Sequence, residues 1–318
     1  ACIISLEEIM NVRLRRGYRI IISSDIPIGG GMGSSGALEV CFLKLISHLY
    51  NVNMSTQTLA EIAFIAENRV LGIPCGRLDQ YASAFGGVIM LWPKYPPKVE
   101  KLEKPPLEIL VIDSGVKHKT KAIHPTRQEE IMRGVKELLA MHPPNNLRRK
   151  LEGRLDEIEW NTLSEEELLP YIDKINPTSA KRILFTIRMN ILTSIAVRIL
   201  KREPLTINDR AFLGRIGISA EDNKEILFAI INKQHELLRD LYEVSIPRIE
   251  KIRQAMLDAG AYGVKISGAG MGGSVLAIAE NPEDVKKAAL RAGASKAYVL
   301  KLDEGARVEV SSKSYSKI

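Results

Sequence analysis

Apolar and polar residues change their spacing several times along the first 110 residues. Short apolar runs predict strands, and apolar residues three and four positions apart predict helices. The expected elements in chain order are a strand at 18–24, helices at 37–49, 55–71 and 79–85, and strands at 88–92 and 107–113. Ser55 is expected to cap the second of these helices. Five of the fifteen prolines lie in 93–106, so an irregular connection is expected there.

The chain then becomes mostly helical before a mixed pattern returns near its end. The later elements are long helices over 178–259, strands at 263–266, 274–279 and 297–302, and a helix at 282–292. A chain of 318 residues is long enough to bury two separate cores. We therefore expect two domains.

The glycine-rich segment 27–36, with the sequence PIGGGMGSSG, is the most informative motif. It lies between a strand-like run and a helix-like run, and its glycines remove the side chains that would keep a ligand from the backbone. Free N–H groups and the dipole at a helix N-terminus favour an anion, so we expect a phosphate cradle for a nucleotide. No Lys-Ser or Lys-Thr follows the glycines, which excludes a Walker A loop. Ser34 and Ser35 would also cap the helix in any fold.

A second glycine cluster spans 268–273 and matches the dinucleotide fingerprint GxGxxG by its letters alone. That fingerprint needs a helix after it, whereas 274–279 predicts a strand, so a Rossmann assignment is rejected. Two interpretations remain: a glycine hairpin that allows close approach of another backbone or ligand, and a plain tight turn.

Two carboxylates are the strongest candidates for chemistry. Glu67 shares a helix face with Ala60, Ala63 and Val70, where a carboxylate is costly unless it is paired or bound to a metal ion. A Mg²⁺ site and a buried ion pair with an arginine or lysine are equal alternatives on spacing alone. Asp79 begins a short helix, so it is either an N-cap or a group that positions a reacting hydroxyl in phosphoryl transfer.

Composition restricts the partners. The net charge of +7 and the pI near 9.2 suit anionic small substrates, while an aromatic content of 5% without any nucleic-acid motif argues against nucleic acid. No apolar run approaches the length of a membrane span, so no membrane partner is expected. Cys2, Cys41 and Cys75 show neither metal-ligand spacing nor a disulfide pattern, which favours the cytoplasm.

Three motifs in this order resemble the GHMP kinase superfamily, which includes galactokinases, homoserine kinases and mevalonate kinases. They are the 27–36 loop, the segment GRLDQ at 76–80, and the segment KISGAGMGG at 265–273. Other segments resemble the galactokinase branch in particular: Ser24–Pro27, Pro74–Gly76, Ile112–Val116 and Leu238–Ser245, with Pro247. The resemblance covers most of 18–302 apart from 142–176, which resembles an insertion.

The resemblance implies a role for each matching residue. The residues that would cradle the phosphates of ATP are Pro27, Gly29, Gly30, Gly31, Met32, Gly33, Ser34 and Ser35. Ser34 and Glu67 would hold Mg²⁺, and Asp79 would take the proton of the attacking hydroxyl. The residues that would border the substrate are Gly76, Asp79, His124, Gly268 and Gly270. His124 stands where galactokinases have a sugar-contacting tyrosine.

The fold implied by the resemblance is a two-domain α+β fold. An N-terminal GHMP kinase domain of the ribosomal S5 domain 2-like type would span 1–108, and a ferredoxin-like domain with a helical insertion near 142–176 would span 109–318. The chain begins downstream of the family segment that contacts the hydroxyl groups of the sugar. We therefore expect that segment, and the first strands of the N-terminal domain, to be absent from this chain.

The function implied by the resemblance is that of an ATP- and Mg²⁺-dependent sugar kinase, which phosphorylates a monosaccharide at its anomeric hydroxyl. Two alternatives stay open: a kinase of the same superfamily that acts on mevalonate or another small alcohol, and a non-catalytic sugar or nucleotide sensor with a kinase fold. A substrate panel distinguishes the first alternative, and tight binding without ADP formation distinguishes the second.

Overall fold

The computed structural model describes residues 1–26, 32–104, 107–116 and 120–309, and for 120–122 and 124 it describes the backbone alone. The chain divides into two compact units, 1–104 with 302–318 and 105–301. The sequence-based division had placed the whole C-terminal tail in the second domain. Residues 302–309 of this tail belong to the first unit because their backbone hydrogen-bonds there: Gly87 N donates to Asp303 O over 2.7 Å.

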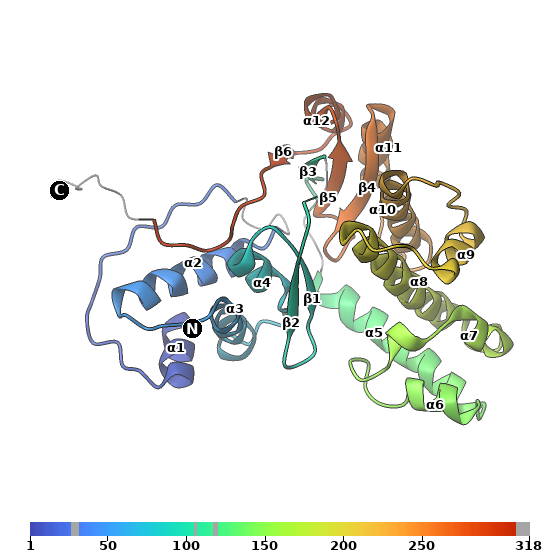
Figure 1. Ribbon diagram of the computed structural model, residues 1–318, viewed down its shortest axis with the longest axis horizontal. Coiled ribbons are helices and arrows are strands. Elements are labelled where there is room, and N and C mark those ends of the chain that lie inside the picture. Colours follow the sequence, from blue (N-terminus) through green and yellow to red (C-terminus); the bar gives the residue numbers. More distant parts are fainter. Residues whose placement is uncertain (27–31, 105–106, 117–119, 310–318) are drawn as a thin grey trace. The chain divides into compact units, whose positions relative to one another are not determined.

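The first unit is mainly helical (Figure 1). Its elements are α1 (Cys2–Met10), α2 (Ser34–Leu49), α3 (Thr56–Ile65), the π-helical turn η1 (Ala66–Val70), α4 (Leu78–Phe85), β1 (Val88–Trp92) and β2 (Lys98–Leu102). The expected cap of the second helix is confirmed, since Ser55 Oγ accepts the N–H of Thr58 over 3.0 Å. Buried apolar side chains of α1 to α4 form the core of this unit, with Leu6, Leu43 and Ile62 at its centre.

Two predictions in this unit are wrong: the strand at 18–24 and the wholly irregular connection at 93–106. Residues 18–24 form no strand, because no described segment pairs with them, and Ile21 is 84% exposed. The proline-rich connection 93–106 contains β2, which pairs antiparallel with β1 from Trp92↔Lys98 to Val88↔Leu102. The prolines stand on both sides of β2, so the strand itself keeps all the N–H groups that the ladder needs.

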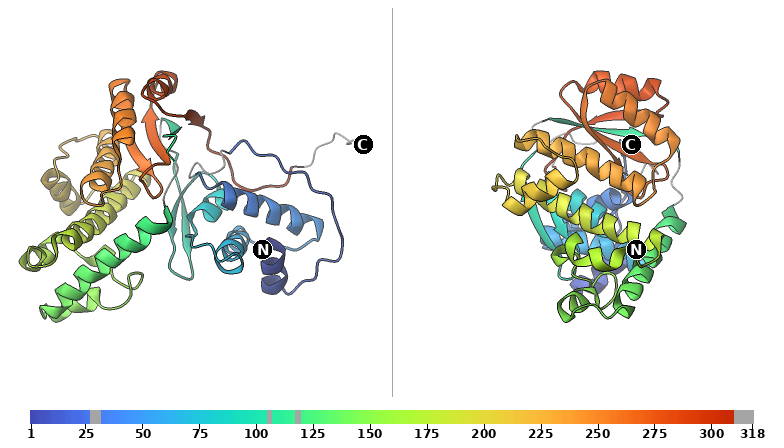
Figure 2. Two further views of the ribbon diagram at one scale, coloured as in Figure 1. Left: turned by 180° about the vertical axis from the view of Figure 1, so that it is seen from behind. Right: turned by 90° about the vertical axis from the view of Figure 1, so that its right-hand side faces the viewer.

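The second unit contains a four-stranded antiparallel sheet. Its strands are β3 (Glu108–Asp113), β4 (Ala261–Ser267), β5 (Ser274–Ala279) and β6 (Lys296–Leu300), in the spatial order β4-β5-β3-β6. Helix α11 (Pro247–Asp258) precedes β4, and α12 (Pro282–Arg291) connects β5 to β6. The two helices pack against each other and on the sheet (Figure 2). This arrangement confirms the ferredoxin-like prediction.

Helices α5 to α10 lie in the chain between β3 and β4. They are α5 (Thr120–Ala140), α6 (Asn145–Leu151), the 3₁₀ turn η2 (Trp160–Thr162), α7 (Glu165–Ile172), α8 (Pro177–Leu200), α9 (Ile207–Arg215) and α10 (Asn223–Asp240). The segment expected as an insertion, 142–176, forms α6, η2 and α7, whose buried leucines Leu147, Leu151 and Leu168 pack with α5 and α8.

Helix α8 corrects the expectation that no segment approaches a membrane span. It is long and apolar enough to cross a membrane by length and composition. In this structure α8 contacts α5 and α10, and its fully buried Arg182 pairs with Glu130 and Glu243, each at 2.7 Å. Apolar residues of α8 also belong to two buried clusters of the second unit, so these contacts hold the helix within that unit.

Side chains of α10 cover the free edge of β4. Asn232 Oδ1 accepts the N–H of Val264 over 3.1 Å, and His235 Nδ1 accepts the N–H of Ile266 over 3.3 Å. Burial lowers the pKa of His235, so the ring is neutral and its Nε2–H donates to Glu250 over 2.8 Å. The edge strand therefore has hydrogen-bond partners although no further described strand pairs with it.

The glycine cluster 268–273 forms the connection between β4 and β5. A Cβ atom on Gly270 would lie 2.5 Å from Val244 O, and one on Gly272 would lie 2.5 Å from Val116 O. Of the two interpretations left open, the close-approach hairpin is confirmed, and the backbone that approaches belongs to the chain itself. Two galactokinase-like segments, 112–116 and 238–245, therefore meet the GHMP kinase motif 265–273 at this hairpin.

Replacing Gly270 tests this packing. Gly270→Ala should lower the free energy of unfolding of the second unit by about 2 to 4 kcal/mol, because φ is +77° and the methyl group collides with Val244. Trp160 fluorescence in a Trp92→Phe background follows urea unfolding of this unit. The control Gly214→Ala has no atom within 4 Å of the new methyl group and should be neutral or slightly stabilising. Equal stability of the two variants would contradict the account.

Candidate active site

The N-terminus of α2 has no side-chain cap among the described residues. Gly33 is the N-cap residue, with φ of +65°, and Ser34 is the first helical residue. The expectation that Ser34 and Ser35 cap the helix is therefore wrong, because both lie within the first turn instead of before it. The first N–H groups of this 16-residue helix have no side-chain acceptor among the described residues, which is what an anion site requires. Of the predicted cradle, Pro27, Gly29, Gly30 and Gly31 lie outside the described residues, and Met32 is half-buried beside Gly33.

Asp79 lies directly beside this helix start. It is the second residue of α4, whose N-cap is Arg77, so Asp79 is not an N-cap. A Cβ atom on Gly33 would lie 3.0 Å from Asp79 Cγ, and one on Gly36 would lie 3.1 Å from the main-chain carbon of Asp79. The two glycines thus let the starts of α2 and α4 pack together and bring the carboxylate to the N-terminus of α2.

Glu67 is a buried carboxylate on the π-helical turn η1, with 7% of its surface exposed. It accepts a hydrogen bond from Gln80 Nε2 over 2.6 Å. Within the part of the chain that the structure describes, no arginine or lysine pairs with it. The ion-pair alternative therefore finds no support, and a carboxylate oxygen without a protein cation suits Mg²⁺. π-Helical turns occur often at functional sites.

A third carboxylate in this region, that of Glu39, is absent from the residues predicted from the sequence. Glu39 on α2 is 9% exposed, and its Oε2 lies 3.4 Å from Gln80 Nε2. Burial, and then the charge of Glu67, raise the pKa of Glu39 to about 7. The signal was available, because Glu39 shares a helix face with the apolar Leu43 and Ile46, the same pattern that identified Glu67.

The negative charge of Glu67 also affects the pKa values of its neighbours. Burial and the charge of Glu67 raise the pKa of Asp79, which makes this carboxylate a stronger base. Burial and a hydrogen bond to Glu67 contribute to raising the pKa of the Cys75 thiol to about 11. Asn68 fixes the loop that carries Cys75 by donating to its carbonyl oxygen over 3.1 Å. The group is thus a set of carboxylates that lacks a positive partner among the described side chains.

The other predicted substrate residues are placed separately. Gly76 precedes α4, and a Cβ atom there would meet nothing within 4 Å, so its backbone is open to a ligand. Gly268 and Gly270 lie in the hairpin of the second unit. His124 lies in α5, and the structure describes its backbone but not its side chain.

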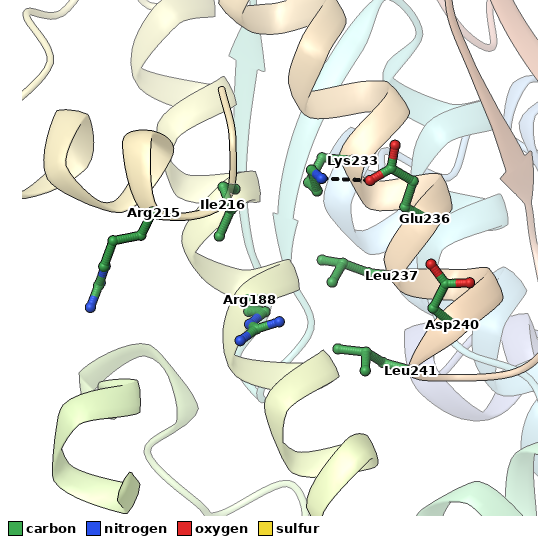
Figure 3. Close-up of a pocket in the computed structure, with 8 residues that line it drawn as sticks. All are labelled: Arg188, Arg215, Ile216, Lys233, Glu236, Leu237, Asp240 and Leu241. Carbon is green, nitrogen blue, oxygen red and sulfur yellow. Dashed lines mark hydrogen bonds and ion pairs between the residues drawn. The ribbon is translucent and has the colours of Figure 1, made fainter. Parts of the chain in front are cut away.

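A cavity of about 240 Å³ in the second unit contains none of the predicted residues (Figure 3). It lies between α8, the end of α9 and α10, and the charged side chains around it already have partners. Arg188 pairs with Glu165 over 2.6 Å, Lys233 pairs with Glu236 over 2.5 Å, and Asp240 pairs with Arg239 over 2.7 Å. These ion pairs leave little charge for an anionic ligand.

The family of the chain follows from two matches. The family model for the GHMP kinases N terminal domain matches residues 2–87, and that for the GHMP kinases C terminal domain matches residues 214–297. Together they cover more than half of the chain, so the chain belongs to the GHMP kinases. Its relatives place it in the galactokinase-like branch of this superfamily.

Two curated relatives illustrate the similarity. The galactokinase of Pyrococcus furiosus is 27% identical over 285 residues, which cover 86% of this chain and 69% of that protein. The galactokinase of Thermotoga maritima is 29% identical over 283 residues, which cover 84% of this chain and 68% of that protein. The matched region therefore spans about two thirds of each relative.

Solved structures agree on the fold. The galactokinase of Lactococcus lactis, solved in complex with galactose, superposes with a TM-score of 0.70 at 22% identity and covers 96% of this chain and 74% of its own. The mevalonate kinase of Methanococcus jannaschii gives a TM-score of 0.58 at 18% identity, covering 94% of this chain and 72% of its own. The expected two-domain α+β fold is confirmed.

The raised pKa of Glu39 gives a stability test. An unfolded glutamate titrates near 4.5 and Glu39 near 7, so the folded protein binds more protons between these pH values, and stability falls as pH rises through this window. At pH 8 the free energy of unfolding of Glu39→Gln should therefore be about 1 to 2 kcal/mol higher than that of the wild type. At pH 4.5 the variant should show no such gain.

Urea unfolding in EDTA, followed by Trp92 fluorescence in a Trp160→Phe background, measures this difference in the first unit. Glu8→Gln replaces an exposed glutamate of α1 and should leave the pH profile unchanged. A Glu39→Gln profile parallel to that of the wild type from pH 4.5 to 8 would contradict the burial of a charged Glu39.

Proposed function

We propose that the chain is an ATP-dependent sugar kinase, which transfers the γ-phosphoryl group of ATP to the anomeric hydroxyl of a monosaccharide. The observation that carries the proposal is the uncapped start of α2, with Asp79 and the buried carboxylate of Glu67 close to it. The relatives in the galactokinase-like branch support a sugar as the acceptor.

The phosphates of ATP would bind to the start of α2. The N–H groups of Gly33, Ser34 and Ser35 have the position and polarity to hold phosphate oxygens, and the loop before them would complete the cradle. The helix dipole adds partial positive charge at the same place. Such fixed donors stabilise the charge on the transferred group without rearranging during the reaction.

Ser34 and Glu67 would hold Mg²⁺ beside these phosphates. A hydroxyl and a carboxylate are oxygen ligands of the kind that Mg²⁺ prefers, and Glu67 lacks a described cationic partner. When bound, Mg²⁺ neutralises part of the phosphate charge. The burial of Glu67 supports this role, because an uncompensated buried carboxylate is costly in the folded protein.

Asp79 would accept the proton of the attacking hydroxyl. Its carboxyl group lies beside the α2 terminus, and its raised pKa favours proton uptake. Gly76, three residues earlier, would let the acceptor approach the backbone, whereas acceptor contacts of His124, Gly268 and Gly270 stay predictions from the sequence resemblance alone. The reaction then depends on holding the hydroxyl in line with the γ-phosphorus atom.

The cytoplasm is the proposed location of this activity. Cys2, Cys41 and Cys75 are all free in the structure, as expected in a reducing compartment.

Substrate identity is tested by coupled ADP release with Mg-ATP and a panel of monosaccharides, mevalonate and homoserine. One sugar should give turnover, and NMR of the product should show coupling between phosphorus and the anomeric proton. Turnover with mevalonate alone would contradict the sugar assignment. Binding of ATP and a sugar without formation of ADP would favour the alternative of a non-catalytic sensor.

The role of Asp79 is tested by Asp79→Asn. This change removes the proton acceptor at nearly constant shape, so kcat should fall by about 10²- to 10⁴-fold while the affinity for Mg-ATP stays close to that of the wild type. The control Asp173→Asn changes an exposed aspartate at the end of α7 and should retain full activity. Full activity of Asp79→Asn would rule out the assigned role.

A further inference from the structure

We propose that Gln80 is a positioning residue that holds the carboxylate of Glu67 in place for a cation, and that Glu39 holds Gln80 in turn. This inference rests on the proposed function, because it assigns a task to groups that surround the proposed Mg²⁺ ligand. Neither Gln80 nor Glu39 has a role in the sequence-based assignment.

The geometry joins three elements through one amide group. Gln80 is 1% exposed, and its Nε2 donates to Glu67 Oε2 over 2.6 Å and approaches Glu39 Oε2 at 3.4 Å. A glutamine amide nitrogen carries two N–H donors, so it can serve both carboxylates at once. The amide therefore links α2, which begins at the phosphate site, to η1 and to α4, which carries Asp79.

The electrostatics explain why this link is needed. Glu39 and Glu67 are both buried, and two carboxylates that share one amide nitrogen lie close enough for like charges to repel. A glutamate side chain has three rotatable bonds, so repulsion alone would turn the carboxylates apart. An amide between them supplies partial positive charge and fixes the direction of the Glu67 oxygens.

The oxygen of the Gln80 amide also indicates that this side chain does more than fill the core. The other polar atom of this side chain, Gln80 Oε1, is buried and has no hydrogen-bond partner among the described residues. An unsatisfied buried carbonyl oxygen destabilises the fold. A glutamine retained under this cost is better explained by what its N–H groups hold than by its contribution to the core.

The variant Gln80→Met tests the proposal because methionine fills a similar volume without N–H donors. Mn²⁺ serves as the probe, and its binding to the protein in the presence of a non-hydrolysable ATP analogue is measured by electron paramagnetic resonance. Loss of a residue that orients a metal ligand should weaken Mn²⁺ binding by about 10- to 100-fold. Nucleotide binding in EDTA should stay unchanged, and the Mg²⁺ concentration needed for half-maximal ADP formation should rise in parallel.

The matched control is Gln234→Met, which removes a second buried glutamine amide. Gln234 lies in α10 of the other unit, where it donates to Thr193 Oγ1 over 3.2 Å and accepts from Lys265 Nζ over 3.1 Å. Its replacement should change the stability of that unit while leaving the affinity for Mn²⁺ unaltered.

A double-mutant cycle tests the part assigned to Glu39. If Glu39 acts through Gln80, Glu39→Gln should weaken Mn²⁺ binding in the wild type and have little further effect in Gln80→Met. An equal loss in both backgrounds would mean that Glu39 acts only through its charge, which would overturn its assigned part.

The outcomes separate this inference from the proposed function. A wild-type chain that binds Mn²⁺ with nucleotide, together with a Gln80→Met variant of equal affinity, would overturn the inference alone. A wild-type chain that binds nucleotide but no Mn²⁺ beside it would contradict the proposed cation site, and the inference with it.

Discussion

The first unit depends on one constraint: it buries carboxylates that have no described arginine or lysine partner. Glu39 and Glu67 sit in a core otherwise built from apolar side chains of α1 to α4, and a single amide lies between them. Such an arrangement lowers the stability of the folded chain unless something compensates the charge. In the proposed function, a divalent cation next to bound phosphates would supply that compensation, so the same groups that destabilise the unbound protein would favour the bound one.

Glycines determine how closely the functional segments approach, and both units use this device. In the first unit, Gly33 and Gly36 leave room for Asp79 against the start of α2. In the second unit, Gly270 and Gly272 let a hairpin pack on the backbone of segments that lie far away in the sequence. The glycine-rich motifs therefore allow one backbone segment to pack directly against another. In α2 this packing leaves the first N–H groups of the helix without a described side-chain cap.

The sequence predicted those features that depend on local patterns. The bounds of β1 and β5 and the cap at Ser55 followed from apolar runs and capping chemistry. Features that depend on distant partners were missed: 18–24 lacks a described pairing strand, and β2 exists because β1 lies beside it. The approach of Asp79 to Gly33 and the link from Glu39 through Gln80 are likewise contacts that spacing along one helix cannot reveal.

Hydrogen–deuterium exchange with and without a Mg²⁺-bound, non-hydrolysable ATP analogue tests the central claim most directly. The account predicts slower exchange at the N–H groups of Gly33 to Gly36, because nothing described caps this helix start until phosphate binds. It also predicts protection of the segment that contains Glu67. Nucleotide binding that leaves exchange at the start of α2 unchanged, with protection only in the second unit, would contradict the account.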